Sequence, residues 1–335
     1  MKNNNLPENK ASKIKVFGLG AWGCSTVNFM YKQGIIGTDF IIGSSDSEVL
    51  DKYSVPKKIF FDNRLEVNLN STEEKQISPD NEEKIKLMLG NDTQILFIIG
   101  TLGNTDGCAA LIAKMAKETK IEGDIRENSL LSIGFFSLPF DTIIYKPIRS
   151  SDEELKETRK YIDSVLICKS KHFLDPFPES NEESTMKLLK AIKGISLIVN
   201  TNSFINIDLV DIYTIMKNKG GVAFIGFGSG NGENRAIIAI EEALYSHNFK
   251  YRSIKGTRSI LLYFMYSKPY ELTMVEVQKV TDFIVKTTGT FIDIIWGAGE
   301  DNGLGDKLVI TFLAGDYTDS EEKIYALYRK YDYLY

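Results

Sequence analysis

Glycines at regular spacing form the most suggestive chemical group near the start of the chain. Gly18, Gly20 and Gly23 match the pattern GxGxxG, after the apolar run KIKVFG and before a helical pattern over residues 25–33. Strand, glycine turn and helix in this order bring free backbone N–H groups to the positive end of a helix dipole, which predicts an anion site. Asp46 stands roughly where a nicotinamide cofactor would need an acidic ribose contact. The motif alone leaves a dinucleotide enzyme and a purely structural turn both open.

A second glycine-rich turn, from Gly100 to Gly107, lies between the buried-strand pattern QILFII and an amphipathic helical pattern over residues 109–117. Two helix amino termini that face one ligand suit the phosphate chain of a nucleoside triphosphate. The sequence lacks the pattern GxxxxGK[ST], so that motif supplies no lysine to the phosphates. The second turn therefore argues against the nicotinamide interpretation and favours a nucleotide.

Polar residues at fixed spacing follow a long helical pattern in the middle of the chain. Asn206, Asp208 and Asp211 form the pattern NxDxxD. Phosphoryl transfer mainly needs an oriented water and charge stabilisation, which two carboxylates and a metal ion can supply. The same residues also suit the cap of a helix that starts at Leu209. Both interpretations stay open on these residues alone.

The elements that must position these residues alternate along the first half of the chain. Apolar strands and helical patterns alternate up to Cys168, which predicts a Rossmann-like α/β unit with a parallel sheet covered on both faces. Ser151 and Glu154 predict a capping box at the start of one of its helices. A long helical stretch follows over residues 178–196. Beyond it we expect a smaller α+β unit with a mixed sheet, including a strand over residues 222–226.

Composition and charge exclude several classes of protein. The chain has 335 residues and a formal net charge of −5 without a basic stripe, so nucleic acid is not an expected partner. Apolar runs such as residues 95–99 are far shorter than the roughly 20 residues of a membrane-spanning helix, so we expect no direct membrane insertion. Three scattered cysteines favour a reducing cytoplasm over a disulfide framework. With two histidines in all, zinc hydrolysis and histidine-based catalysis are not expected.

The order of these motifs resembles the FtsZ branch of the tubulin superfamily from about Lys13 to Gly315. The first turn is similar to the family's GxGGGGxNxV loop, and the second to its GGGTGTG signature with one residue fewer. Asn206 to Asp211 matches the family's NxDxxD loop and lies directly after the long helix, as in the family. Further matches are Ser137 to Phe140, Gly232 to Ala236, Gly256 to Arg258, Trp296 to Gly299, and Leu308 to Gly315.

This resemblance implies a cytoskeletal protein of cell division that binds GTP or GDP with Mg²⁺ and polymerises head to tail. It implies slow GTP hydrolysis, completed by Asn206, Asp208 and Asp211 of the adjacent subunit. The implied nucleotide contacts are Gly18, Gly20, Ala21, Trp22, Gly23, Cys24, Ser25, Gly103, Asn104, Thr105, Asp106, Gly107 and Pro139. The implied organisation is a disordered lead, a nucleotide-binding domain, a central helix with linker, a C-terminal activation domain and a tail, over residues 1–12, 13–177, 178–204, 205–316 and 317–335.

Departures from the family pattern support a second hypothesis. Trp22 brings a bulky ring to the first turn, and Asp106 brings an acidic group to the second, where only Mg²⁺ would relieve its repulsion of phosphate. The family's guanine contacts fall on Met186 and Asn181, which supply neither the carboxylate nor the stacking ring. The alternative is therefore a nucleotide-poor pseudo-GTPase that caps or copolymerises with an authentic FtsZ and modulates its assembly.

Overall fold

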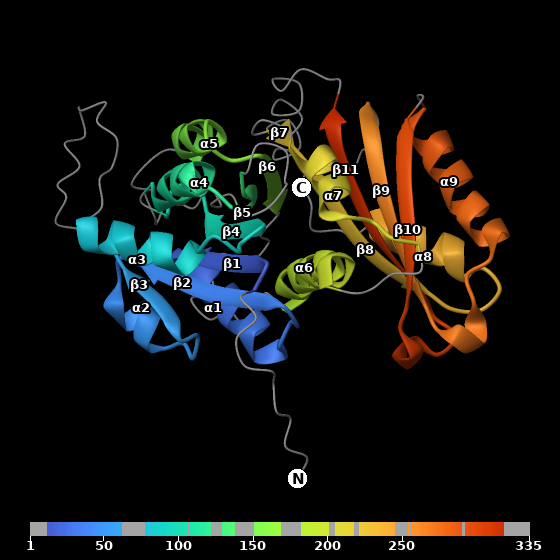
Figure 1. Ribbon diagram of the computed structural model, residues 1–335, viewed down its shortest axis with the longest axis horizontal. Helices are drawn as coiled ribbons and strands as arrows, with labels where there is room; N and C mark the ends of the chain where they lie inside the picture. Colours follow the sequence, from blue (N-terminus) through green and yellow to red (C-terminus); the bar gives the residue numbers. More distant parts are fainter. Residues whose placement is uncertain are drawn as a thin grey trace, which may run out of the picture.

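The computed structural model describes most of the chain. The described residues are 12–61, 78–105, 107–121, 129–137, 151–168, 182–200, 205–217, 221–244, 254, 256–289 and 292–317. They form two sheets that lie side by side with a long helix, α6, between them (Figure 1). The α/β and α+β units expected from the sequence are both confirmed.

The larger sheet is parallel, with strand order β3-β2-β1-β4-β5-β6-β7. Its strands are β1 (Ile14–Leu19), β2 (Thr38–Ser44), β3 (Lys57–Phe60), β4 (Ile95–Thr101), β5 (Leu131–Ser137), β6 (Ser164–Cys168) and β7 (Gly221–Val222). Gly18 pairs with Ile42 on β2 and with Ile99 on β4, so the ends of β1 and β4 lie next to each other. This register brings the two glycine turns to one edge of the sheet.

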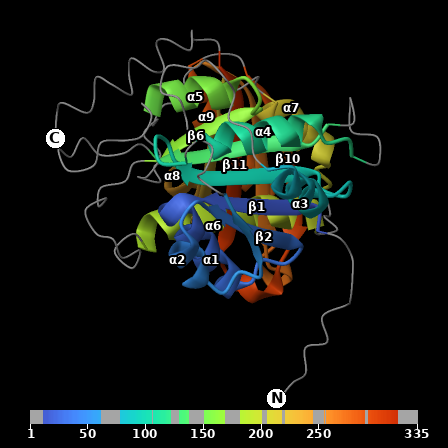
Figure 2. The same ribbon diagram turned by 90° about the vertical axis from the view of Figure 1, so that its left-hand side faces the viewer.

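Helices cover both faces of this sheet. On the side of α6 (Glu182–Asn200) lie α1 (Gly20–Gln33) and α2 (Ser47–Asp51), and the other side carries α3 (Pro79–Leu89), α4 (Cys108–Glu118) and α5 (Ser151–Arg159) (Figure 2). The strands between them are apolar and buried along nearly their whole length, as a sheet covered on both faces requires.

The smaller sheet is mixed, with strand order β10-β9-β11-β8. Its elements are α7 (Leu209–Met216), β8 (Phe224–Gly230), α8 (Arg235–Leu244), β9 (Thr257–Tyr266), α9 (Met274–Thr288), β10 (Asp293–Glu300) and β11 (Leu308–Tyr317). β9 and β10 run parallel, whereas β11 runs antiparallel to both β9 and β8. The Arg235 side chain, 7% exposed, pairs with Glu276 and so ties the start of α8 to α9.

The strand expected over residues 222–226 is divided in the structure. Val222 pairs with Val165 of the large sheet, whereas Phe224 pairs with Ala314 of the small one. A local apolar pattern cannot show which sheet a strand joins, because tertiary packing decides it. The chain thus passes from one sheet to the other at Ala223.

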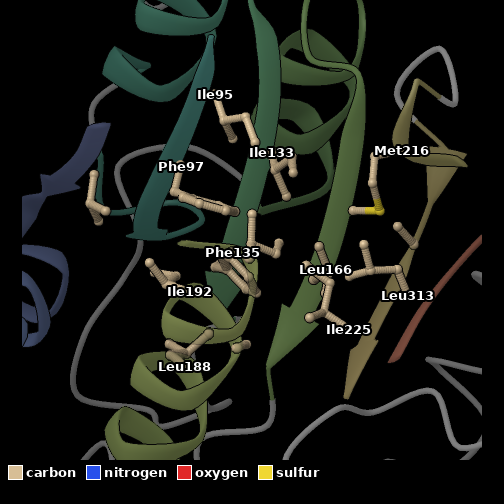
Figure 3. Packing of buried hydrophobic residues seen from close by; sticks show 14 of the residues in the cluster. Ile95, Phe97, Ile133, Phe135, Leu166, Leu188, Ile192, Met216, Ile225 and Leu313 are labelled. Atoms are coloured by element: carbon tan, nitrogen blue, oxygen red, sulfur yellow. The ribbon is translucent and has the colours of Figure 1, made fainter. Parts of the chain in front are cut away.

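The apolar core is continuous across the two sheets. Ile192 of α6 lies beside Phe135 of β5, and Leu166 of β6 lies beside Ile225 and Leu313 of the small sheet (Figure 3). All five side chains are at most 1% exposed. Shared burial of this kind fixes the position of one sheet relative to the other. In open parallel sheets, ligands generally bind beyond the carboxyl ends of the strands, which is the edge that carries the glycine turns here.

Candidate functional site

The first glycine turn presses the start of α1 against the sheet. A Cβ atom on Gly18 would lie 2.3 Å from the carbonyl oxygen of Gly23, and one on Gly23 would lie 2.3 Å from that of Ile99. Gly20 opens the helix with φ of +68°, a conformation that side chains disfavour. The three glycines of the motif are therefore required by close backbone approach and by turn geometry.

The amino terminus of α1 carries no side-chain cap. Leu19 precedes the helix and makes no capping hydrogen bond, and the first turn of the helix contains no acidic residue. Ala21 is exposed and Trp22 is half-buried against the core, so the indole leaves the end of the helix accessible at Ala21. An uncapped helix terminus with accessible backbone fits an anionic ligand such as a nucleotide phosphate.

The next two residues of α1 point their side chains into the protein. The Cys24 thiol lies 3.4 Å from the carbonyl oxygen of Gly43, and burial raises its pKa to about 12. Ser25 is buried and hydrogen-bonds to Tyr53. Asn28, also buried, accepts hydrogen bonds from the backbone and side chain of Ser54. Cys24 and Ser25 thus have only backbone groups to offer a ligand at this turn.

The second glycine turn lies against the first. A Cβ atom on Gly20 would lie 3.1 Å from the backbone oxygen of Asn104, which is exposed. Gly103 and Gly107 adopt φ values of +86° and +77°, and Thr105 between them is buried. Asp106 and Pro139, both predicted nucleotide contacts, lie outside the described residues. The two turns form one continuous backbone surface at the edge of the sheet.

A carboxylate from α5 occupies the second turn. Glu154 accepts hydrogen bonds from the backbone N–H groups of Gly103 and Gly107 and from the Thr105 hydroxyl. The bond to Gly107 measures 3.0 Å, and Glu154 is 0% exposed. The Ser151 hydroxyl donates to the Leu102 carbonyl oxygen at 3.3 Å.

The capping box predicted from Ser151 and Glu154 is therefore wrong. Both side chains bind the turn that precedes α4 instead of closing the start of their own helix. The sequence does carry the S-x-x-E signal, but this pattern reports only local contacts. The destination of Glu154 depends on the packing of α5 against α4, which joins residues about 50 positions apart.

The NxDxxD residues begin α7 and bind each other. Asp208 Oδ1 accepts from the Asp211 N–H, and Asp211 Oδ2 accepts from the Asp208 N–H, both at 3.0 Å. This capping box matches the structural interpretation of the motif. Asn206 and Asp208 are exposed and Asp211 is partly so. A carboxylate has about four lone-pair sites, so capping does not exhaust either group.

The aspartates and the glycine turns lie at opposite edges of the large sheet. Tyr213 of α7 hydrogen-bonds to Ser129, just before β5, and the Met216 carbonyl oxygen accepts from Ser164, the first residue of β6. The glycine turns follow the last residues of β1 and β4. Figure 2 shows α5 and α7 toward opposite ends of the sheet. Asp208 and Asp211 therefore cannot reach the glycine turns of their own chain.

The described part of the chain offers neither a metal cluster nor a membrane-spanning helix. No group of three or more histidine, cysteine, aspartate or glutamate side chains there could hold a metal ion. None of the helices in those same ranges has the length and apolar character needed to cross a bilayer. Asp46, the ribose contact of the nicotinamide interpretation, caps α2 by accepting from the Glu48 N–H.

Comparison with known proteins identifies similar sequences and structures. Residues 221–318 match the family model described as "FtsZ family, C-terminal domain". The chain is 29% identical over 330 residues to "Cell division protein FtsZ" of Aquifex aeolicus, which covers 93% of this chain and 85% of that protein.

Solved structures share the fold. "FtsZ dimer, empty (M. jannaschii)" matches with a TM-score of 0.68 at 23% identity, over 92% of this chain and 89% of that one. "CetZ2 from Haloferax volcanii - GTPgS bound protofilament" matches with a TM-score of 0.65 at 14% identity, over 95% and 97% of the two chains. At these identities the structural likeness supports the fold alone.

Proposed function

Because this chain belongs to the FtsZ/tubulin superfamily, we propose that it is an FtsZ-like cytoskeletal protein of cell division that binds a guanine nucleotide and assembles head to tail. The observation that carries the proposal is the uncapped amino terminus of α1 at the first glycine turn, with Ala21 exposed beside it. The CetZ2 neighbour of the same fold is described as a GTPgS-bound protofilament, which supports a nucleotide in this fold.

The position of the two aspartates supports assembly. Asp208 and Asp211 are held at the edge of the large sheet opposite to the glycine turns, so they can serve a nucleotide only in an adjacent subunit. Head-to-tail stacking brings the α7 end of one subunit to the glycine turns of the next, in the heterologous contact that generates filaments. The relatives described as an FtsZ dimer and a CetZ2 protofilament support self-association of this fold.

We place the proposed slow hydrolysis of GTP at the same contact. The capping box fixes the backbone that carries Asp208 and Asp211, and in the assembled filament their carboxylates would orient a water on the neighbouring nucleotide. Bound Mg²⁺ would supply charge neutralisation of the phosphates. The first turn of α1 has no acidic side chain that could hold that ion.

A mixing experiment tests the shared site. Ala21→Glu places a charge at the first glycine turn that repels phosphate, and a glutamate near a helix amino terminus does not weaken the helix. Asp211→Asn keeps a side-chain oxygen for the capping box and removes the catalytic charge. Each variant alone should lack GTPase activity. An equal mixture should recover about a quarter of wild-type activity, because that share of random head-to-tail contacts joins two intact halves.

The controls separate chemistry from folding. Circular dichroism should show that both variants are folded, because Asp211→Asn keeps an acceptor for the Asp208 N–H and Ala21→Glu leaves the capping box untouched. If the mixture stays as inactive as the separate variants while wild type hydrolyses GTP, the active site is not shared between subunits.

One observation favours the alternative of a pseudo-GTPase that acts on an authentic FtsZ. Asp208 and Asp211, which would serve the nucleotide site of an adjacent subunit, are in place. The chain's own second glycine turn, in contrast, is filled by Glu154. This alternative predicts that the protein changes the GTPase rate of an added FtsZ but retains no nucleotide itself. Chromatography of nucleotide extracted from freshly purified protein separates the two functions.

A further inference from the structure

The second glycine turn already contains an anion. The Glu154 carboxylate receives the N–H groups of Gly103 and Gly107 and the hydroxyl of Thr105, and it is 0% exposed. Burying a carboxylate is costly unless hydrogen bonds compensate it, and here the turn supplies three donors. Among the described residues, these donors come from the turn itself and none is a cationic side chain.

These donors are the groups that a phosphate would use. Glycine-rich turns before a helix bind anions through backbone N–H groups that converge on one point. In this turn the Gly103 and Gly107 N–H groups converge on the Glu154 carboxylate, the Asn104 N–H binds the Thr101 carbonyl oxygen and the Cys108 N–H binds that of Thr105. The Glu154 carboxylate thus takes up two backbone N–H groups of the kind that bind phosphate in such turns.

We propose that Glu154 is an internal anion that occupies the phosphate position of the second glycine turn and competes with nucleotide phosphate there. The effect of Glu154 on nucleotide affinity rests on the proposed function, whereas its occupation of the anion position in the second glycine turn does not. The chain would hold nucleotide mainly through the first turn, and entry of phosphate at the second turn requires displacement of the carboxylate. Glu154 is then a specificity-determining residue that lowers the affinity for polyphosphates.

The test uses the full chain and inorganic pyrophosphate as the probe. Glu154→Ala vacates the position and frees two N–H groups, so calorimetry should show pyrophosphate binding at least about tenfold tighter than in wild type. Glu154→Gln keeps the size of the side chain and removes its charge, so it should give a smaller gain. Glu153→Gln removes the same charge from the exposed neighbouring position and should bind like wild type.

A structural brace and a competitor predict opposite results. If Glu154 only braces the turn, its removal loosens the turn, and pyrophosphate binding falls or stays unchanged. Pyrophosphate should also raise the melting temperature of Glu154→Ala by several degrees and that of wild type by much less. Unchanged or weaker binding in both variants, an equal gain in Glu153→Gln, or failure of both Glu154 variants to fold would overturn the proposal.

The same experiment separates this proposal from the proposed function. A GTP titration of the same proteins reports on nucleotide binding. If no protein in the series binds GTP but Glu154→Ala gains pyrophosphate affinity, the nucleotide function fails and the internal anion stands. If wild type binds GTP and Glu154→Ala gains neither ligand, the internal anion fails and the nucleotide function stands.

Discussion

The two glycine turns share one edge of the large sheet but differ in what they leave accessible. Both follow a buried strand and precede a helix, and they touch at Gly20 and Asn104. The first turn ends at a helix terminus that has no side-chain cap and no acid, whereas the second holds the buried carboxylate of Glu154. Similar local motifs therefore leave different backbone groups accessible, and a residue from a distant helix makes the difference.

This difference changes what the family resemblance implies for the chain. Two turns with accessible backbone N–H groups would bind a phosphate chain from both sides, as the sequence predicted. Under the proposed function, with one turn filled, we expect the affinity for nucleotide to depend mainly on the first turn and on how readily Glu154 moves. The predictions below act on one turn at a time, so that each measures what that turn contributes.

The largest effect is expected at the first turn from Gly23→Ala. The new methyl group would lie 2.3 Å from the Ile99 carbonyl oxygen. This oxygen belongs to the backbone of β4, so the strand would have to shift to relieve the clash. We expect a loss of about 3 kcal/mol in the free energy of unfolding, measured by urea denaturation, together with loss of nucleotide binding. Gly34→Ala at the other end of α1 is the control, because a Cβ there meets nothing within 4 Å. Equal losses in the two variants would contradict the close approach.

The second effect is a pH dependence that belongs to the first turn. Burial raises the pKa of the Cys24 thiol from its ordinary 9.0 to about 12. Because the folded pKa is the higher one, the stabilisation is complete below pH 9 and is lost as pH rises toward 12. By pH 10 the loss should reach about 1.4 kcal/mol relative to pH 8.

Comparison with Cys24→Ala isolates this contribution from other groups that titrate in the same range. Urea denaturation of both proteins at pH 8 and pH 10 should show a smaller decline in the variant. If the two proteins lose the same stability over this range, then Cys24 is not the buried thiol that the structure describes.

The smallest effect is expected at the second turn from Gly107→Ala. Gly107 has φ of +77°, and an alanine in this region costs about 1 kcal/mol. The same Gly34→Ala variant, with φ of +64°, measures the backbone strain by itself. Any excess loss at Gly107 measures how far the new side chain disturbs the turn that Glu154 binds. Equal losses would mean that the turn at Gly107 tolerates a side chain as well as the end of α1 does.

Sequence reasoning predicted what depends on local pattern and failed where distant packing decides. The glycine spacing and the flanking strand and helix patterns sufficed to place both turns at the ends of β1 and β4. The NxDxxD motif correctly signalled a helix start, because capping is a contact between neighbouring residues. The motif could not show whether the aspartates also serve chemistry, since that depends on a second subunit.

Two errors have the same physical origin. The local sequence around Glu154 fits a capping box. Only the packing of α5 on α4 directs its carboxylate to Gly103 and Gly107. The strand over residues 222–226 was expected as one piece, but Val222 joins the large sheet and Phe224 the small one. Neither outcome is encoded in a short window of sequence.

A calorimetric titration of GTP with Mg²⁺ into three proteins tests the central claim most directly. The claim is that the first turn binds the nucleotide while Glu154 occupies the second. Wild type should bind GTP, Ala21→Glu should lose the binding, and Glu154→Ala should bind at least about tenfold tighter than wild type. Binding that is absent from all three proteins, or equal in wild type and Ala21→Glu, would contradict the account.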